Sequence, residues 1–212
     1  MCSFRKIYYF CRVKEYAFCM PYARDLLKVK QTGFSLAAGR LLISVPYYND
    51  AFFNRSVVLL TDYDAEHCAG LIINRRLPYR VRDLVDGLRV NTPMFLGGPV
   101  MPWALFLLHD IENNAASSRI VPKVYVGYDQ SLLTQIESNA LASGNCKFLM
   151  GYAGWSPGQL EDEISKNMWV IGNPTPELVF HKEPETVWSE SVRILGPDYE
   201  HWLRIPKYIN LN

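Results

Sequence analysis

Apolar, β-branched runs separated by short polar turns fill the chain between residues 41 and 74. The first run, Leu41–Val45, predicts a strand that ends at Pro46, because proline has no N–H to donate to a sheet. The next two, Ser56–Tyr63 and Ala69–Asn74, lack polar alternation and predict strands buried on both faces. Since the connections are short, we expect the three strands to pair antiparallel as a meander.

From residue 81 onward, helical and extended patterns alternate. Apolar spacing of three and four residues predicts helices, and short apolar runs predict further strands. The predicted helices are 81–88, 130–143, 156–167 and 185–195, and the predicted strands are 94–96, 104–110, 123–128, 147–155 and 168–172. Asp129 is the expected N-cap of the second helix and Ser156 that of the third, with Gln159 closing a capping box. Residues 196–212 are expected to be mostly irregular.

The order of these elements, with strands first and helices mixed in later, predicts an α+β fold. We expect a single domain over residues 31–212, with a mixed, largely antiparallel β-sheet or barrel-like core and flanking helices. The composition supports a folded chain: of 212 residues, 49% are hydrophobic and 20% are charged, which excludes a mostly disordered, collagen-like or coiled-coil protein.

Residues 1–30 differ from the rest of the chain in charge. They hold seven basic and two acidic residues, a net charge of +5, whereas the other 182 hold 15 basic and 19 acidic residues, a net charge of −4. Aromatic residues beside basic ones suit an interfacial membrane anchor. The interpretation that we favour is a disordered tail or a misannotated start, with Met20 as the second candidate start, because the segment lacks periodicity. We therefore expect residues 1–19 to be dispensable for stability.

The cysteines and the hydropathy pattern bear on location and partners. The five cysteines form no C-x-x-C or Cys/His ligand spacing, so we predict reduced thiols and no zinc site. No early apolar run suits a signal peptide, and none approaches the roughly 18 residues of a membrane span, so we predict a cytoplasmic protein. An acidic body neutralises phosphates poorly, and direct binding of duplex DNA is not expected.

Two glycine-rich segments are the candidate ligand site. Gly97-Gly98-Pro99 fits either a backbone nest for an oxyanion or a tight turn. The segment Gly151–Trp155 precedes a predicted helix, whose N-terminus attracts anions such as nucleotide phosphates, but a purely structural corner with glycines at positive φ is the favoured interpretation. Asn74 ends a buried strand, either as a pocket amide or as a strand end that reaches water. The candidate ligand-binding residues are Asn74, Gly97, Gly98, Pro99, Gly151, Tyr152, Gly154 and Trp155.

Catalytic signals are weak, and we assign no catalytic residue, metal or cofactor. The chain has no P-loop, no G-x-G-x-x-G and no G-x-S-x-G motif. His67 and Cys68 are adjacent, so an extended chain points their side chains to opposite faces. His109, beside Asp110, is either a general base or, as we favour, a group that caps a strand end.

Five segments together resemble the AlgH/YqgE family of bacterial proteins. They are GRLLISVPYYNDAFFNRSVVLLTDYD, AGLIINR, FLGGPV, LLHD and GYAGWSPGQLEDEI, in order between Gly39 and Leu195. The resemblance implies a single α+β domain on a mixed, barrel-like sheet. Members are often labelled transcriptional regulators, after a link to alginate production, although no molecular activity is established for them.

Three functional hypotheses follow. The first, implied by the resemblance, is a cytosolic regulatory or interaction protein without enzymatic activity. The second is a small-ligand or nucleotide-binding protein that uses the two glycine segments together with Asn74. The third is a hydrolase-like enzyme that uses His109 or Cys68.

Overall fold

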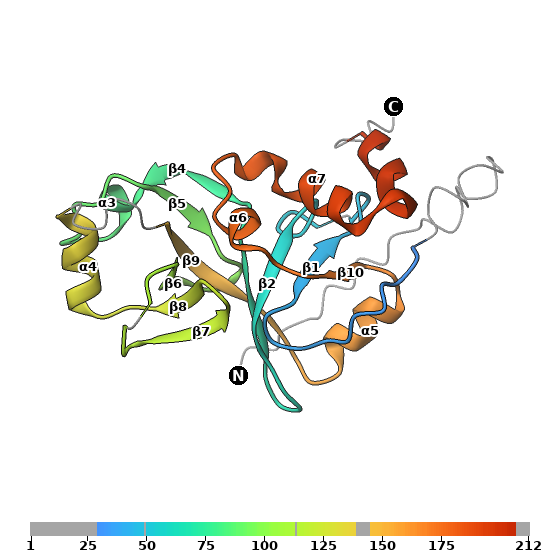
Figure 1. Ribbon diagram of the computed structural model, residues 1–212, viewed down its shortest axis with the longest axis horizontal. Helices are drawn as coiled ribbons and strands as arrows, with labels where there is room; N and C mark the ends of the chain where they lie inside the picture. The colour runs from blue at the N-terminus through green and yellow to red at the C-terminus, as the bar shows by residue number, and fades with distance from the viewer. Residues whose placement is uncertain (1–28, 49, 113, 139–144, 207–212) are drawn as a thin grey trace, which may run out of the picture.

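The computed structural model describes residues 29–48, 50–112, 114–138 and 145–206. In these residues, ten strands form one curled, largely antiparallel sheet in the order β10-β1-β2-β3-β9-β6-β8-β7, with β5 beside β9 and β4 beside β5 (Figure 1). The strands are β1 Leu41–Ser44, β2 Val57–Tyr63, β3 Cys68–Ile72, β4 Arg76–Arg80, β5 Pro93–Leu96, β6 Val100–His109, β7 Ser117–Val121, β8 Val124–Gly127, β9 Cys146–Trp155 and β10 Trp169–Gly172.

Helices flank the sheet. They are α3 Val81–Leu84, α4 Gln130–Glu137, α5 Gln159–Ser165, α6 Pro176–Val179, α7 Pro184–Leu195 and the 3-10 helix η1 Pro197–Arg204. Figure 1 shows α7 across one face of β1 and β2, with α3 and α4 at the other end of the molecule. The predicted single-domain α+β fold is confirmed in this form.

The predicted meander β1-β2-β3 is confirmed. Its side chains point alternately to the two faces of the sheet, and each face has its own hydrophobic core. Leu41, Leu59 and Leu71 are aligned across the three strands and pack with α7 and η1. Their neighbours Leu42 and Val58 face the opposite side, where they pack with Trp155 and Trp169. Because side chains alternate along a strand, a continuous apolar run fills both faces at once.

Strand β9 connects the two halves of the sheet. Its first half pairs in parallel with β5 on one side, where Phe148 lies opposite Met94. Its second half pairs antiparallel with β3 on that same side, where Ala153 lies opposite Gly70. Strand β6 follows the other side of β9 with a bulge, because residues 101–104 of β6 lie opposite a single residue, Gly151.

Several predicted boundaries are wrong for local reasons. The helix expected over 81–88 ends at Leu84, because Val85 is extended and Gly87 turns the chain at a φ of +82°. Gly158, at a φ of 74°, is the N-cap of α5, where we expected Ser156. The Gln159 side chain still accepts a hydrogen bond from the Ser156 N–H at 3.0 Å, so half of the capping box forms. Residues 139–143 of the second predicted helix lie outside the described residues.

Strands β4 and β7 and helix α6 were not predicted from the sequence. Strand β6 starts at Val100, four residues before the predicted strand, and η1 covers part of the segment expected to be irregular.

The last two residues of the basic N-terminal segment belong to the folded body. Val29 packs against the core, and Lys30 Nζ lies 2.6 Å from Asp198 Oδ2 in η1. The predictions for residues 1–28, including the dispensable residues 1–19, lie outside the described residues. Within the described ranges, no helix is long and apolar enough to cross a membrane.

Lys147, on β9, is a buried lysine that no carboxylate pairs with in the described part of the chain. Its Nζ donates to the carbonyl oxygens of Ile73 at 2.8 Å and Val179 at 2.7 Å, and it lies 4.6 Å from the centre of the Phe95 ring. Because Val179 ends α6, the lysine joins that helix to the sheet. Burial lowers the pKa of Lys147 to about 7.

We expect Lys147 to make stability depend on pH. In the unfolded chain the amine has its ordinary pKa of 10.5, against about 7 in the native state. Between these values the unfolded state binds more protons, so the free energy of unfolding rises with pH. The expected rise between pH 7 and 8, below the ordinary pKa of about 8.5 for cysteine, is about 1 kcal/mol by urea unfolding.

Lys147→Met should remove this rise, because the substitution removes the buried titrating group. Lys123→Met should keep it, because Lys123 is exposed. A rise of the same size in Lys147→Met would show that another group causes it.

Candidate functional site

The structure brings the two predicted glycine segments into direct contact. The Gly97 N–H donates to the Met150 carbonyl at 2.8 Å, and the Gly97 carbonyl accepts from the Ile72 N–H at 2.8 Å. Gly97 therefore lies at the point where the partner of β9 changes from β5 to β3. We call this contact of Gly97 and Gly98 with Gly151 and Tyr152 the glycine crossing.

Main-chain atoms fill the glycine crossing. A Cβ on Gly97 would lie 2.2 Å from the Gly151 oxygen, and one on Gly98 would lie 2.1 Å from the Tyr152 carbonyl carbon. Gly151 also has a φ of 69°, and its Cβ would lie 2.4 Å from the Gly98 oxygen. The glycines are thus explained by close approach of the backbone and by positive φ, the structural interpretation favoured from the sequence.

The other residues of the two segments flank the crossing. Pro99 is exposed, and the Tyr152 ring packs edge-on against Phe106 with 6.0 Å between centroids. Gly154 pairs with Ala69 in the sheet.

Trp155 is part of a buried aromatic cluster. Its ring stacks on Phe53 with 6.3 Å between centroids and meets the edge of Trp169 at 6.2 Å. The Glu163 carboxylate accepts from both indoles, at 2.9 Å from Trp155 Nε1 and 2.8 Å from Trp169 Nε1. This carboxylate ties α5 to the sheet and places negative charge near the corner that was a candidate anion site.

Asn74 uses its amide inside the protein. Its Oδ1 accepts from the Val57 N–H at 2.9 Å, and its Nδ2 donates to the Arg55 carbonyl at 2.9 Å. The side chain is 9% exposed and holds the start of β2 against the end of β3. It therefore acts as a structural clamp and does not line the glycine crossing with a free amide.

His109 is arranged for structure. Its Nδ1 accepts from the Ile111 N–H at 3.2 Å, so Nε2 carries the proton and donates to Ser117 Oγ at 2.8 Å. Ser117 Oγ in turn donates to Asn114 Oδ1 at 3.0 Å. A catalytic dyad requires the imidazole to accept the serine proton, which is the opposite direction. Burial lowers the pKa of His109 and keeps the ring neutral.

The two cysteines of the body are protonated thiols. Burial raises the pKa of Cys68 to about 12, with smaller contributions from Glu161 and Glu163, and burial raises the pKa of Cys146 to about 11. Since the thiolate is the nucleophile, neither is activated. In the described part of the chain, no group of three His, Cys, Asp or Glu side chains could hold a metal ion.

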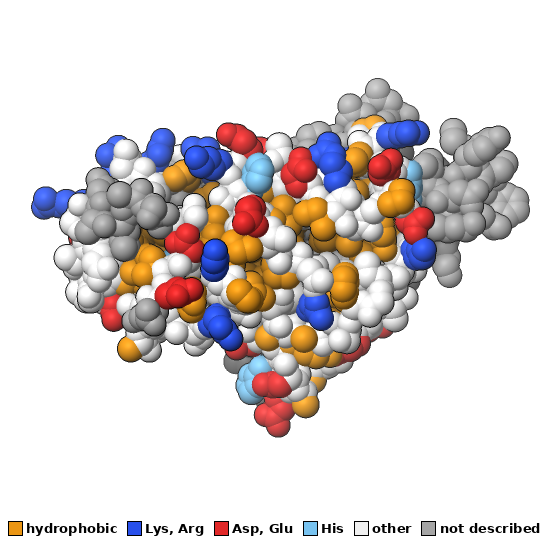
Figure 2. Space-filling model, viewed as in Figure 1, with side chains coloured by type: hydrophobic (Ala, Val, Ile, Leu, Met, Phe, Trp, Pro, Cys, Tyr) orange, Lys and Arg blue, Asp and Glu red, His pale blue; other side chains and the backbone are white. Residues whose placement is uncertain are grey.

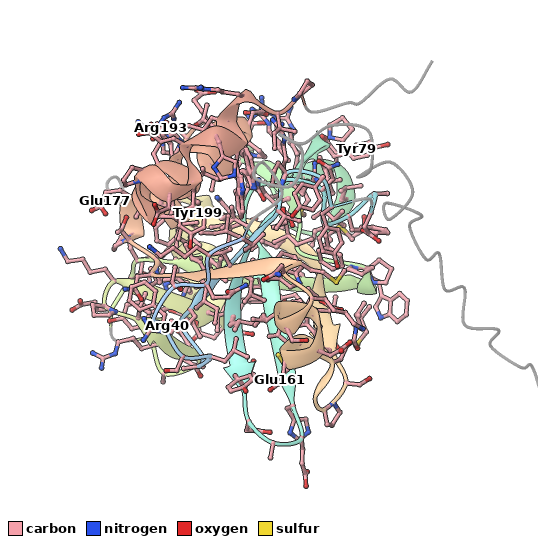
Figure 3. All side chains as sticks on the ribbon, turned by 90° about the vertical axis from the view of Figure 1, so that its right-hand side faces the viewer. Arg40, Tyr79, Glu161, Glu177, Arg193 and Tyr199 are labelled. Carbon is pink, nitrogen blue, oxygen red and sulfur yellow. The ribbon has the colours of Figure 1, made fainter. Side chains whose placement is uncertain are left out.

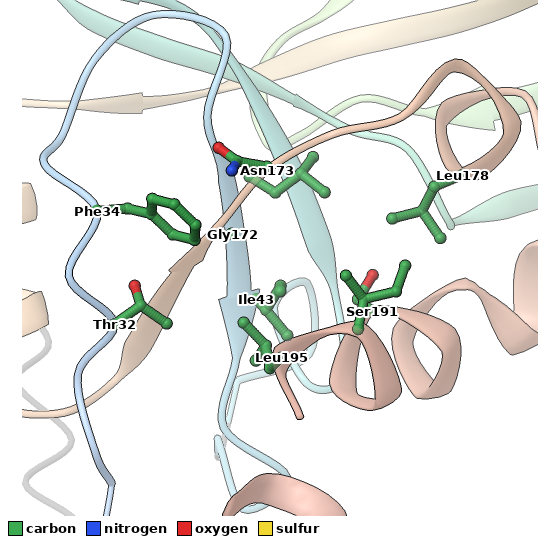
Figure 4. A pocket seen from close by; sticks show the side chains of 10 residues that line it. Thr32, Phe34, Ile43, Gly172, Asn173, Leu178, Ser191 and Leu195 are labelled. Carbon is green, nitrogen blue, oxygen red and sulfur yellow. The ribbon is translucent and has the colours of Figure 1, made fainter. Parts of the chain in front are cut away.

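A cavity lies on the face of the sheet that α7 covers, away from the glycine crossing (Figure 4). Its volume is about 230 Å³. Strands β1 and β10 form its floor, α7 and Leu178 form one side, and the segment that carries Thr32 and Phe34 forms the other. The lining residues are Thr32, Phe34, Leu41, Ile43, Gly172, Asn173, Leu178, Ser191, Ile194 and Leu195.

The polar atoms of the cavity are of two kinds. Thr32 Oγ1 donates to the Ile171 carbonyl at 2.7 Å and Ser191 Oγ to the Val187 carbonyl at 2.8 Å, so both hydroxyls are already committed as donors. At one end, the Arg40 guanidinium donates to Asn173 Oδ1 and stacks 5.1 Å from the centre of the Phe34 ring. That end therefore carries positive charge and N–H donors.

Gly172 makes room for the cavity. A Cβ there would lie 2.9 Å from Ile43 Cδ1 and 3.8 Å from Leu195 Cδ2, and both residues line the cavity. Its φ is not in the positive range, so backbone conformation does not explain the glycine. Sequence reasoning missed this residue; the available signal was a glycine at the end of a buried strand.

The profile of the AlgH-like family matches residues 41–200 of this chain. The chain belongs to the AlgH-like family. This confirms the resemblance identified from the sequence, and the matched range contains both parts of the glycine crossing.

Relatives and solved structures agree with this AlgH-like assignment. UPF0301 proteins from Parabacteroides distasonis and Bacteroides fragilis are 31% and 32% identical, over 89% of this chain and 98% and 97% of their own lengths. The solution structure of the AlgH protein from Pseudomonas aeruginosa has a TM-score of 0.65 at 26% identity, covering 80% of this chain and 94% of that one. A crystal structure of a Corynebacterium diphtheriae protein, at 19% identity and a TM-score of 0.68, shares the fold.

Two tryptophans of this AlgH-like chain test whether the corner is structural. Trp155→Ala should lower the free energy of unfolding by about 3–5 kcal/mol, because it empties a buried site and removes a partner of Glu163. Trp103→Ala should change it by less than about 0.5 kcal/mol, because Trp103 is 74% exposed. Urea unfolding followed by far-ultraviolet circular dichroism measures both. Equal, small losses would contradict the structural role of the corner.

Proposed function

We propose that this protein is a non-enzymatic binding protein whose ligand is a small carboxylate with an apolar body. The cavity beside α7 carries the proposal, because it joins an apolar lining to one cationic, donor-rich end. The regulatory role implied by the family resemblance would then be a response to ligand occupancy.

The size and lining of the cavity limit the ligand. About 230 Å³ is less than the roughly 300–1,000 Å³ typical of pockets for drug-sized molecules, so the ligand has few heavy atoms. Leu41, Ile43, Leu178 and Leu195 favour an aliphatic or aromatic body.

The charge of the ligand's head group is inferred from the N–H donors at the Asn173 end of the cavity. Asn173 Oδ1 is already occupied by Arg40, and among the described residues its Nδ2 has no acceptor. Arg40 adds positive charge at the same end. An acceptor with negative charge, a carboxylate, matches both groups, whereas an ammonium would be repelled.

A binding role is favoured over a hydrolase by the state of the candidate nucleophiles and base. The thiols of Cys68 and Cys146 have raised pKa values, and His109 donates its proton to Ser117. Neither arrangement activates a nucleophile.

Hexanoate is the probe that tests the proposal. We expect it to shift the methyl NMR signals of the leucine and isoleucine residues that line the cavity, saturably and with a dissociation constant of about 1 mM, as suits so small a ligand. Hexylammonium, with the same chain and the opposite charge, should shift them at least about tenfold less.

Matched glycine variants locate the binding. Gly172→Val should fill the cavity and abolish the hexanoate shifts, because its side chain extends toward Ile43 and Leu195. Gly33→Ala should retain them, since a Cβ there meets no atom within 4 Å. Shifts that persist in a folded Gly172→Val protein, or that hexylammonium reproduces, would overturn the proposal.

A further inference from the structure

A second surface, at the other end of the molecule, is unlike the acidic body. Between Arg75 and Arg89 the chain has five arginines and two aspartates. Figure 2 shows Lys and Arg side chains gathered along the edge where Figure 1 places β4 and α3. We call this the arginine surface and define it by Arg76, Tyr79, Arg80, Arg82 and Arg89, all of which are exposed.

The guanidinium groups of this surface are largely available. In the described part of the chain, Arg76 and Arg89 make no side-chain hydrogen bond or ion pair. Arg80 uses one N–H on the Asn91 carbonyl at 3.1 Å, and Arg82 lies 3.7 Å from Asp83. Arg75 is excluded, because it donates to the carbonyl groups of residues 52 and 54.

The acidic groups near the surface are partly engaged. Asp83 accepts from the Arg80 N–H at 2.8 Å, and Glu137 accepts from the Arg89 N–H at 2.7 Å. Asp86 is the third carboxylate of this region. The local charge therefore remains positive on a body whose net charge is −4.

Tyr79 adds an aromatic group among these cations. Its side chain is 51% exposed, and Figure 3 shows it on the opposite side of the molecule from Arg40. Tyr79 adjoins Arg80 in the chain, and an exposed ring at an edge that also carries guanidinium groups provides a base-stacking platform near phosphate-binding donors.

The edge of β4 does not favour a peptide strand as the occupant. Among the described strands, β4 pairs only with β5. Pro78 has no N–H, and the Arg80 N–H is already bonded to Asp83, so two of the five residues of β4 offer no backbone donor for strand addition. Recognition here depends on side chains, and arginine with an exposed tyrosine matches phosphates and bases.

We propose that the arginine surface binds single-stranded nucleic acid. Its four arginines contact the phosphates, and Tyr79 stacks on one base. Because the rest of the body is acidic, contact is limited to this surface, which suits a flexible strand better than a rigid duplex. This inference is independent of the ligand cavity, so either proposal can fail alone.

The test is fluorescence anisotropy of the full chain with a labelled 20-nucleotide uridine strand. The affinity should fall with salt at a log–log slope of about −2 to −3, as expected for three to four phosphate contacts. Because residues 1–30 are also basic, the decisive comparison is between variants of the same full chain.

Arg76→Glu with Arg89→Glu should weaken binding at least about tenfold, whereas Arg76→Lys with Arg89→Lys should stay within about threefold. Tyr79→Ala should weaken it about tenfold, and Tyr79→Phe should leave it within about twofold. Arg119→Glu with Lys182→Glu, an equal charge change elsewhere, should have little effect.

Three results would overturn the proposal. The first is unchanged binding in the Arg76→Glu, Arg89→Glu variant. The second is an equal loss in the Arg119→Glu, Lys182→Glu control, which would indicate a response to net charge alone. The third is equal or tighter binding of a glutamate 20-mer or of duplex DNA, which would assign the surface to an acidic protein partner or to a duplex.

Discussion

The contact between the main chains of Gly97–Gly98 and Gly151–Tyr152 determines how the two halves of the sheet are joined. At this point the partner of β9 changes from the parallel strand β5 to the antiparallel strand β3. Gly97 connects β9 to β3, because its N–H donates to the Met150 carbonyl and its carbonyl accepts from the Ile72 N–H. The backbones lie so close that a Cβ on any of the three glycines would overlap a carbonyl group at 2.1–2.4 Å. The curl of the sheet, and with it the position of every surface on it, depends on this crossing.

Buried polar groups reinforce the join on each side of the crossing. Lys147 connects β9 to α6 through two carbonyl groups, and Glu163 connects α5 to two tryptophans. The two proposed binding sites, the cavity and the arginine surface, both lie away from the glycine crossing. The cavity lies under α7 on the half that contains β1 and β10, and the arginine surface lies on β4, α3 and the segment that follows α3 (Figures 1 and 2).

The sequence predicted what depends on local pattern. The apolar runs of β1, β2 and β3 specified buried strands, and short connections specified their antiparallel pairing. The pairing of β5 with β9 could not be predicted, because it joins segments about 50 residues apart and depends on the whole sheet. Likewise, Trp155 and Trp103 both lie in strands, but Trp155 is 7% exposed and Trp103, which lies in the bulge of β6, is 74% exposed. Asn74 and the glycines led to a binding hypothesis because residue type alone cannot show how they are used. It does not distinguish a free amide from one bonded to the main chain, or an open glycine turn from one packed against another backbone segment.

The most direct test of this account is the free energy of unfolding of Gly98→Ala, measured by urea denaturation beside Gly33→Ala. A methyl group at Gly98 must displace the Tyr152 backbone, which cannot move without separating β9 from β6, so we predict a loss of more than about 3 kcal/mol or failure to fold. Gly33→Ala should change stability by less than about 0.5 kcal/mol, because its Cβ points into open space. A Gly98→Ala protein as stable as the wild type would contradict the account, because the crossing would then not be the constraint that orders the sheet.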